Sequence, residues 1–206
     1  MKTSNLDFRQ FLVDGLRPGT LYNVGNVVLL TSTGAIYGWS VAEKGGGAIA
    51  GLHLAFFGSP GTALATVATL TFFVAGQIYD RAWTAEPTTA VRLYRSGDLV
   101  CTVAAGLLTW ALVVLGQTHL AILGGLLLTG SRLGLSLIPT SCRTRYIRHL
   151  LRCTVAASRI PSIFALALSL ATTDAALSGA EVVSAAMLTA CFFIWLAADL
   201  LMLGIE

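Results

Sequence analysis

Apolar residues along the chain fall into runs close to the ~20 residues that a helix needs to cross the hydrocarbon core of a bilayer. Strict alternation of polar and apolar positions, the pattern of a membrane β-barrel, is absent from these runs. Backbone amides exposed to lipid must be paired within their own segment, which favours helices. We therefore expect six membrane-spanning helices, at Val24–Ala42, Thr62–Tyr79, Leu99–Gly116, Leu120–Thr140, Thr154–Ala171 and Val182–Gly204.

The composition agrees with an integral membrane protein. Hydrophobic residues make up 55% of the chain and charged residues only 11%, whereas about a quarter of the residues in a soluble domain are charged. No polar stretch is long enough to build a separate soluble core. The predicted fold class is an all-α polytopic membrane protein with an N-terminal arm, residues 1–20, and a six-helix transmembrane domain, residues 21–206.

The N-terminal arm has the pattern of a short amphipathic helix. Gly15 and Pro18 are expected to end this helix before the first span. One face of it is apolar and is expected to lie on the cytoplasmic membrane surface. That face consists of Phe8, Phe11, Leu12 and Leu16.

Basic residues are concentrated on one side of the predicted spans. They precede the first span and follow the second and fourth, whereas the opposite side holds only Lys44. Because loops rich in Lys and Arg stay in the cytoplasm, we expect an even number of spans with both termini inside the cell. Many arginines and few lysines suggest a bacterial genome, and hence the bacterial inner (plasma) membrane. The basic residues are Lys2, Arg9, Arg17, Arg81, Arg92, Arg95, Arg143, Arg145, Arg148 and Arg152.

Aromatic residues near the ends of the spans support this orientation, because such rings gather at membrane interfaces. We assign four of them to the inner interface, namely Tyr22, Tyr79, Trp83 and Tyr94.

Residues 47–57 form an apolar segment that is too short to cross a bilayer. The sequence Gly58-Ser59-Pro60-Gly61 should break any continuous helix between this segment and the second span. We expect a short helix in the outer interface. A re-entrant element and a contact with a partner are the alternatives.

A weak internal repeat suggests that the six spans form three helical hairpins. Leu21-Tyr22-Asn23-Val24-Gly25-Asn26 before the first span resembles Leu93-Tyr94-Arg95-Ser96-Gly97-Asp98 before the third. The residues around Ser158-Arg159 in the fifth span are a degenerate third copy.

Polar side chains inside the spans gather in the inner half of the membrane. Ionisable residues at such depth are costly and are functional candidates by default. In the structural interpretation the arginines pair with the aspartates and fix which helices are neighbours. In the functional interpretation the arginines hold an anionic ligand in a cytoplasm-facing vestibule. The candidates are Asn26, Gln77, Asp98, Arg132, Arg159 and Asp199.

The segment after the fourth span carries Arg145, Arg148 and Arg152 at helical spacing. Such a cluster can bind anionic lipid head groups or an acidic partner at the cytoplasmic face. The alternative interpretation is that these arginines only help to orient the helices in the membrane.

Motifs of catalysis and of metal or nucleotide binding are not found. The chain has no HExxH, GxSxG, P-loop or GxGxxG pattern, and its three histidines are far apart. We therefore expect no enzyme activity, no cofactor, no metal site and no nucleic-acid partner. A histidine that ligates a haem or pigment is the one exception left open.

Two functions fit the pattern. The first is a non-catalytic accessory or scaffold subunit of a larger inner-membrane complex, bound to lipid and to other membrane subunits. The alternative is a small transporter that uses Arg132 and Arg159 to bind an anionic or zwitterionic solute.

The predicted orientation can be tested by labelling single cysteines in a variant without the native ones. With Arg145→Cys, a membrane-impermeant maleimide should react only after the cells are permeabilised, because that residue is expected in the cytoplasm. With Lys44→Cys, labelling of intact cells is expected. Labelling of residue 145 in intact cells would contradict the orientation.

Overall fold

The computed structural model describes residues 16–43, 45–141, 143–171 and 180–203, and these ranges are helical apart from short connections. No strand occurs in them, so the predicted all-helical class is confirmed for this part of the chain. The amphipathic helix predicted for the arm falls on residues 1–15, outside the described residues. The described helices are α2 (Pro18–Glu43), α3 (Ala48–Phe57), α4 (Pro60–Thr84), α5 (Pro87–Val114), α6 (Thr118–Leu137), α7 (Arg145–Ala171) and α8 (Ala180–Leu203).

Local chemistry explains where several helices begin and end. Pro60 and Pro87 start α4 and α5, where the missing N–H would have had no partner in the helix. Ser59 caps α4, because its Oγ accepts from the Thr62 N–H at 3.1 Å and its own N–H donates to Thr62 Oγ1 at 3.0 Å. After α5 the chain turns at Gly116, whose φ of 86° suits a residue without a Cβ.

Helix α5 is longer than the span predicted for it. The apolar run predicted a helix from Leu99, whereas α5 begins at Pro87. Hydropathy marks only the part of a helix that suits lipid, and the preceding polar turns continue the same helix. Asp98 therefore lies well inside α5 and not at its start.

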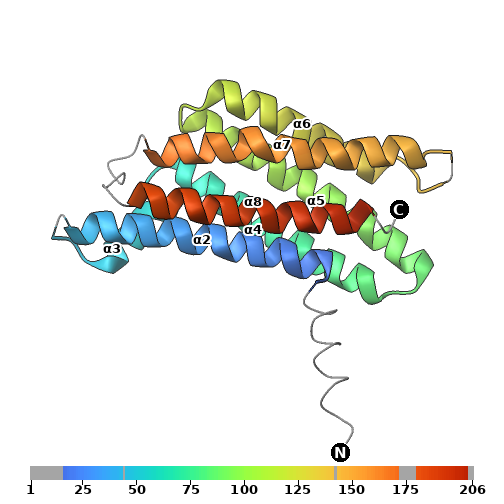
Figure 1. Cartoon of the computed structure of the whole chain (residues 1–206), viewed down its shortest axis with the longest axis horizontal. Helices are drawn as coiled ribbons and strands as arrows, with labels where there is room; N and C mark the ends of the chain where they lie inside the picture. Colours follow the sequence, from blue (N-terminus) through green and yellow to red (C-terminus); the bar gives the residue numbers. More distant parts are fainter. Residues whose placement is uncertain (1–15, 44, 142, 172–179, 204–206) are drawn as a thin grey trace, which may run out of the picture.

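The six long helices pack as a ring in chain order. Each of α2, α4, α5, α6 and α7 packs against the next long helix, and α8 closes the ring against α2 (Figure 1). The most extensive contact joins α4 and α5, which belong to different predicted hairpins. The ring is therefore continuous, and its division into three hairpins stays a prediction.

Exposed arginines gather at one end of the ring. In Figure 1 the connections α4–α5 and α6–α7 lie at this end, together with the start of α2 and the end of α8. The connections α2–α3 and α5–α6 lie at the opposite end. We call the first end the basic end, after its exposed residues Arg81, Arg92, Arg95, Arg143 and Arg145.

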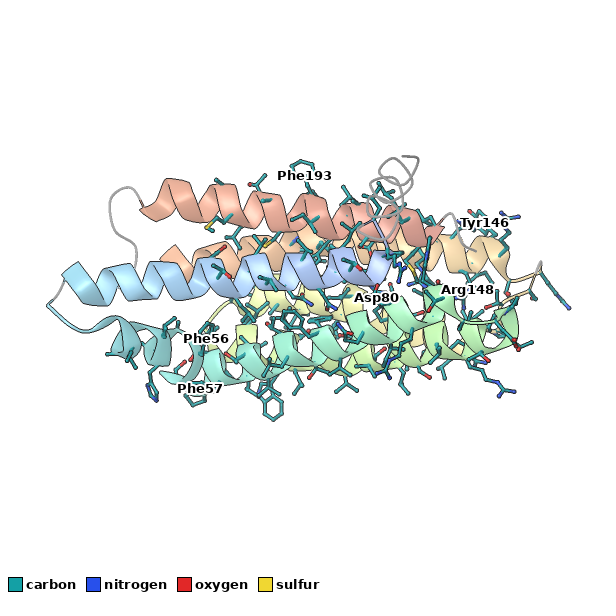
Figure 2. All side chains as sticks on the ribbon, turned by 90° about the horizontal axis from the view of Figure 1, so that it is seen from below. Phe56, Phe57, Asp80, Tyr146, Arg148 and Phe193 are labelled. Atoms are coloured by element: carbon teal, nitrogen blue, oxygen red, sulfur yellow. The ribbon has the colours of Figure 1, made fainter. Side chains whose placement is uncertain are left out.

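Four of the described helical segments are long and apolar enough to cross a membrane, judged by length and composition. They are α4, α5, α6 and the part of α8 from Ala186 to Leu203. Their outer surfaces expose large apolar side chains such as Leu70, Leu126 and Phe193. Figure 2 shows Phe193 pointing outward. A surface of this kind suits lipid and not water, and the chain has the features of a helical membrane protein.

The short helix predicted around residues 47–57 is present as α3, separate from α4. One side of it is exposed, with 84% of Ile49 and 58% of Phe57 accessible. The other side folds back on the ring, where Phe56 approaches Gly34 of α2 and its carbonyl accepts from Thr66 Oγ1 of α4 at 3.0 Å. Figure 2 shows Phe56 and Phe57 on this helix.

Some helical glycines lie at close helix contacts, as expected where small residues let backbones approach. A Cβ on Gly97 would lie 2.5 Å from the ring of Tyr79, and one on Gly25 would meet the Trp195 indole. A Cβ on Gly106 or Gly130 would meet nothing within 4 Å. Gly97 and Gly25 therefore make room for aromatic side chains inside the ring.

Replacing Gly97 by Ala should lower the free energy of unfolding by about 1–3 kcal/mol, because the Tyr79 ring must move. The matched change Gly106→Ala should leave it equal or raise it by up to ~1 kcal/mol through helix propensity. Reversible unfolding in mixed micelles measures both. Equal effects of the two substitutions would contradict the packing described here.

Candidate functional site

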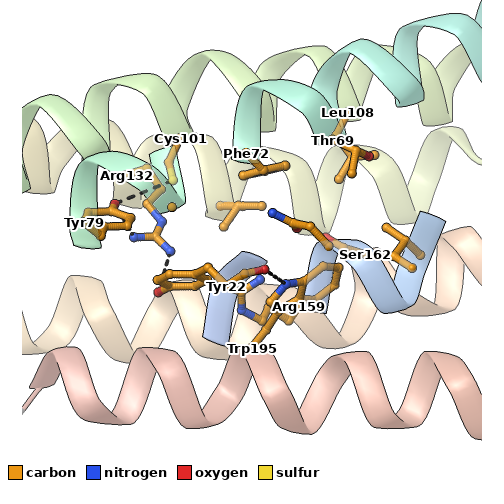
Figure 3. A pocket seen from close by; sticks show the side chains of 14 residues that line it. Tyr22, Thr69, Phe72, Tyr79, Cys101, Leu108, Arg132, Arg159, Ser162 and Trp195 are labelled. Carbon is orange, nitrogen blue, oxygen red and sulfur yellow. Dashed lines mark hydrogen bonds between the residues drawn. The ribbon is translucent and has the colours of Figure 1, made fainter. Parts of the chain in front are cut away.

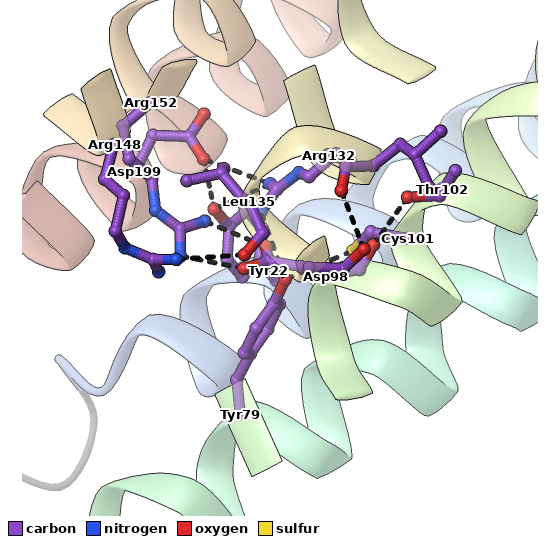
Figure 4. A network of polar contacts seen from close by, with 12 residues as sticks. Tyr22, Tyr79, Asp98, Cys101, Thr102, Arg132, Leu135, Arg148, Arg152 and Asp199 are labelled. Carbon is purple, nitrogen blue, oxygen red and sulfur yellow. Dashed lines mark hydrogen bonds and ion pairs between the residues drawn. The ribbon is translucent and has the colours of Figure 1, made fainter. Parts of the chain in front are cut away.

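Arg132 of α6 lies at the centre of a buried polar network, with 1% of its side chain exposed (Figure 4). Its Nη1 donates to Asp98 Oδ1 at 3.0 Å and to the Tyr79 hydroxyl at 3.1 Å. Its Nη2 donates to the Tyr22 hydroxyl at 3.0 Å and to Asp199 Oδ1 at 3.3 Å. One guanidinium therefore joins α6 to α2, α4, α5 and α8.

Each aspartate also binds an arginine of α7. Arg152 donates from Nη1 and Nη2 to the two oxygens of Asp98, both at 3.0 Å. Arg159 donates to Asp199 from Nε at 2.6 Å and from Nη2 at 3.2 Å. Paired bonds of this kind are the strong form of the arginine–carboxylate contact. We call Arg132, Arg152, Arg159, Asp98, Asp199, Tyr22 and Tyr79 the arginine network.

Two tyrosines complete the arginine network. The Tyr79 hydroxyl donates to Asp98 Oδ1 at 2.7 Å, and the Tyr22 hydroxyl donates to Asp199 Oδ1. The guanidinium carbon of Arg132 lies 5.4 Å from the centroid of the Tyr22 ring and 6.0 Å from that of Tyr79. A cation near the face of an aromatic ring is stabilised, most of all where water is excluded.

Helical spacing accounts for the two arginines of α7. Arg152 and Arg159 are separated by two turns, so both point to the same side of the helix. Trp195 of α8 extends the site, because its ring lies 5.2 Å from the Arg159 guanidinium and its Nε1 donates to the Tyr22 carbonyl at 3.3 Å. Gly25 makes room for this indole.

Two further arginines bind the carboxyl end of α6. Arg148 Nη1 donates to the carbonyls of Leu135 at 2.9 Å and Ile138 at 2.8 Å. Arg95 Nε donates to the carbonyl of Ser136 at 2.8 Å. The last carbonyls of a helix have no partner within it and carry its negative dipole end, so cations stabilise them. These contacts hold α5 and α7 to α6 at the basic end.

A cavity lined by residues of all six long helices adjoins the arginine network (Figure 3). Its lining includes Arg132 and Arg159 and continues along the helices, away from the basic end, to Leu108, Leu128 and Ser162. The cavity thus lies inside the ring, with two arginines at one end.

Two residues that line the cavity each carry a buried nitrogen without a partner among the described residues, namely Arg132 at Nε and Asn26 at Nδ2. A buried donor without a partner costs about 1–3 kcal/mol. An acceptor that reached either nitrogen would remove this cost.

The structure brings together most of the intramembrane polar residues picked out in the sequence. Arg132, Arg159, Asp98 and Asp199 join one network, and Asn26 lines the cavity beside it. Gln77 is exposed on the outside of α4 and takes no part. Its helical position, one residue after the inward-facing Gly76, turns it away from the ring.

The predicted lipid- or partner-binding cluster is corrected by the structure. Arg148 and Arg152 are buried, with 2% and 0% of their surfaces exposed; Arg148 binds carbonyls at the end of α6, and Arg152 binds Asp98. Arg145 is exposed at the basic end and donates to His149 Nε2 at 3.5 Å. Of the three, only Arg145 faces outward, because α7 extends to residue 145 and turns the other two inward.

Sequence reasoning missed the role of the tyrosines. Tyr22 and Tyr79 were assigned to the inner interface, but both are buried and bind aspartates. The close approach of Tyr79 to Gly97 could have marked Tyr79 as buried, but this contact is visible only once the helices are packed. Tyr94 is half-buried and Trp83 is exposed.

Metal ligands do not gather in the part of the chain that the structure describes, where no three His, Cys, Asp or Glu side chains form a group. Cys101 and Cys191 are buried free thiols, and Cys153 is exposed. The chemistry that the cavity offers is therefore hydrogen bonding and charge from its arginines and amide.

Replacing Asp98 by Asn should lower the free energy of unfolding by about 3–5 kcal/mol, because the two arginines it binds would stay buried without that carboxylate. Asp80→Asn is the matched control. Asp80 is partly buried and accepts from Thr20 Oγ1 at 3.2 Å, so its loss should cost only about 1 kcal/mol. Unfolding in mixed micelles measures the free energy that each variant loses. Equal losses for Asp98→Asn and Asp80→Asn would contradict a central role for Asp98.

Comparison with known proteins gives no relative. No family model matches the chain, and no curated protein and no solved structure matches it either. The functional argument therefore depends on the geometry of the arginine network and the cavity.

Proposed function

We propose that α2, α4, α5, α6, α7 and α8 all cross the inner membrane of a bacterium, with the basic end in the cytoplasm. Four of these helices have spans of sufficient length and apolarity, and α2 and α7 complete the same ring. The gathering of exposed arginines at one end supports the orientation, since basic loops stay inside. Both termini are then cytoplasmic.

In this orientation α3 lies at the outer side of the membrane. Its exposed apolar residues Ile49 and Phe57 suit the interface, and its contacts with α2 and α4 hold it against the ring. The proposal for α3 is an interfacial helix that covers the outer ends of its neighbours.

The proposed activity is transport of a small anionic or zwitterionic solute. One observation carries it: a cavity between the six long helices whose lining includes two arginines, Arg132 and Arg159. Binding sites of membrane carriers lie inside the bundle near the middle of the bilayer. Intramembrane arginines that line a cavity mark a solute site by the same reasoning.

The arginine network closes the cavity toward the cytoplasm in this conformation. It joins all six long helices just inside the basic end. Polar groups continue outward at Thr69 and Ser162, so the pathway is not confined to the inner half. Pro161 lies within α7 between Arg159 and Ser162, and removes a backbone hydrogen bond there. A helix can bend at such a point.

A carrier explains these features better than the scaffold subunit that the sequence favoured. A scaffold needs helix contacts but no internal cavity with arginines. The two aspartates of the arginine network each bind two of its three arginines within this chain. The scaffold role remains a prediction and is one outcome of the test.

The experiment is uptake by the purified protein in liposomes, with a panel of labelled carboxylates, phosphates and amino acids. We expect saturable uptake of at least one of these solutes. Asn26→Leu should reduce uptake at a fixed low concentration at least severalfold, because it removes a cavity donor without touching the arginine network.

The control is Gln77→Leu, which makes the same change on the lipid-facing side of α4 and should leave uptake unaltered. Mass measurement after mild-detergent purification tests the competing role. A stable complex with other membrane subunits, together with no uptake of any solute, would favour the scaffold and defeat the carrier.

A further inference from the structure

The charged residues in the described lining of the cavity are the two arginines Arg132 and Arg159. Arg132 Nε and Asn26 Nδ2 are also buried nitrogens without an acceptor. Hydrogen bonds from guanidinium groups to an ionised acceptor are shorter and about twice as strong as neutral ones. The acceptor that fits best is therefore an anionic oxygen.

Carboxylates are missing from the described lining of the cavity. Asp98 and Asp199 lie within the arginine network, and neither lines the cavity. Every oxygen of the two accepts at least one arginine bond. An ammonium group that left water for this cavity would thus meet two cations and no free acidic partner, which is unfavourable.

We propose that the solute is a small organic monoanion whose carboxylate lies against Arg132, Arg159 and Asn26, and that it carries no amine. This inference rests on the proposed carrier function and narrows its solute class from anionic or zwitterionic to anionic. The structure assigns Asn26 as the residue that binds the carboxylate without being needed by the arginine network.

The remainder of the cavity indicates the body of the solute. Phe72, Leu108 and Leu128 supply apolar walls. The Thr69 hydroxyl donates to the Ala65 carbonyl at 2.8 Å, and the Ser162 hydroxyl donates to the Ser158 carbonyl at 2.9 Å. Each hydroxyl oxygen can still accept a hydrogen bond. A short apolar body, with or without a hydroxyl group, therefore fits.

The test measures binding to the full-length protein in lipid nanodiscs by calorimetry. The probes are matched in shape at two sizes: lactate, alanine and lactamide, and then 2-hydroxy-4-methylpentanoate, leucine and 2-hydroxy-4-methylpentanamide. In at least one set the carboxylate without an amine should bind at least tenfold more tightly than both its amino-acid and its amide counterparts.

Variants identify the site of binding. Asn26→Leu should weaken binding of the favoured carboxylate about tenfold, equivalent to ~1.4 kcal/mol, while Gln77→Leu leaves it unchanged. A thermal unfolding curve like that of the parent protein shows that Asn26→Leu is folded. Unchanged affinity in a folded Asn26→Leu variant would overturn the assignment.

The outcomes separate this inference from the proposed function. Tighter binding of alanine or leucine than of the matched hydroxy acid contradicts the proposal of an amine-free monoanion. Binding and uptake of only a phosphate or only an amino acid contradicts it too. Both results are compatible with the carrier function. If no solute of any class binds or is taken up, water satisfies the donors and the carrier proposal fails as well.

Discussion

The bond between Arg132 and its two aspartates is the interaction on which the rest of the ring depends. It places one cation between Asp98 and Asp199, and each of these carboxylates also binds an arginine of α7, Arg152 or Arg159. Buried ion pairs add little net stability, but removing one partner is strongly destabilising. In a membrane, no water would solvate a charge that has lost its partner. The network therefore selects one arrangement of the helices over others.

Geometry around that bond also decides where the cavity lies. The rings of Tyr22 and Tyr79 flank Arg132 and occupy the space between helices near the basic end. Gly25 and Gly97 let the helices close around aromatic side chains at that level. Farther from the basic end, the space between the helices is lined by side chains such as Leu108, Leu128 and Ser162, which leave part of it empty. A tight charged layer and an adjoining cavity are thus two consequences of one packing arrangement.

The same arginines then have two separable tasks. The Nη atoms of Arg132 bind groups of the network, its Nε has no acceptor, and the residue also lines the cavity. Arg159 likewise binds Asp199 and lines the cavity. An anion bound beside these arginines would change the charge next to the network at the basic end. For the proposed carrier, binding and opening would then be coupled through shared residues, as alternating access requires.

Hydropathy and charge along the chain determined that the protein is helical, where most of its long helices lie and which end carries the exposed arginines. Those properties depend on each segment alone, since lipid forces backbone pairing within a helix. The separation of α3 from α4 was also predictable, from Ser59 and Pro60. Only the tertiary structure decided that Gln77 faces outward, that Arg148 and Arg152 are buried, and that the tyrosines bind aspartates. These outcomes depend on how each helix is rotated in the ring, and rotation is set by contacts between residues far apart in the sequence.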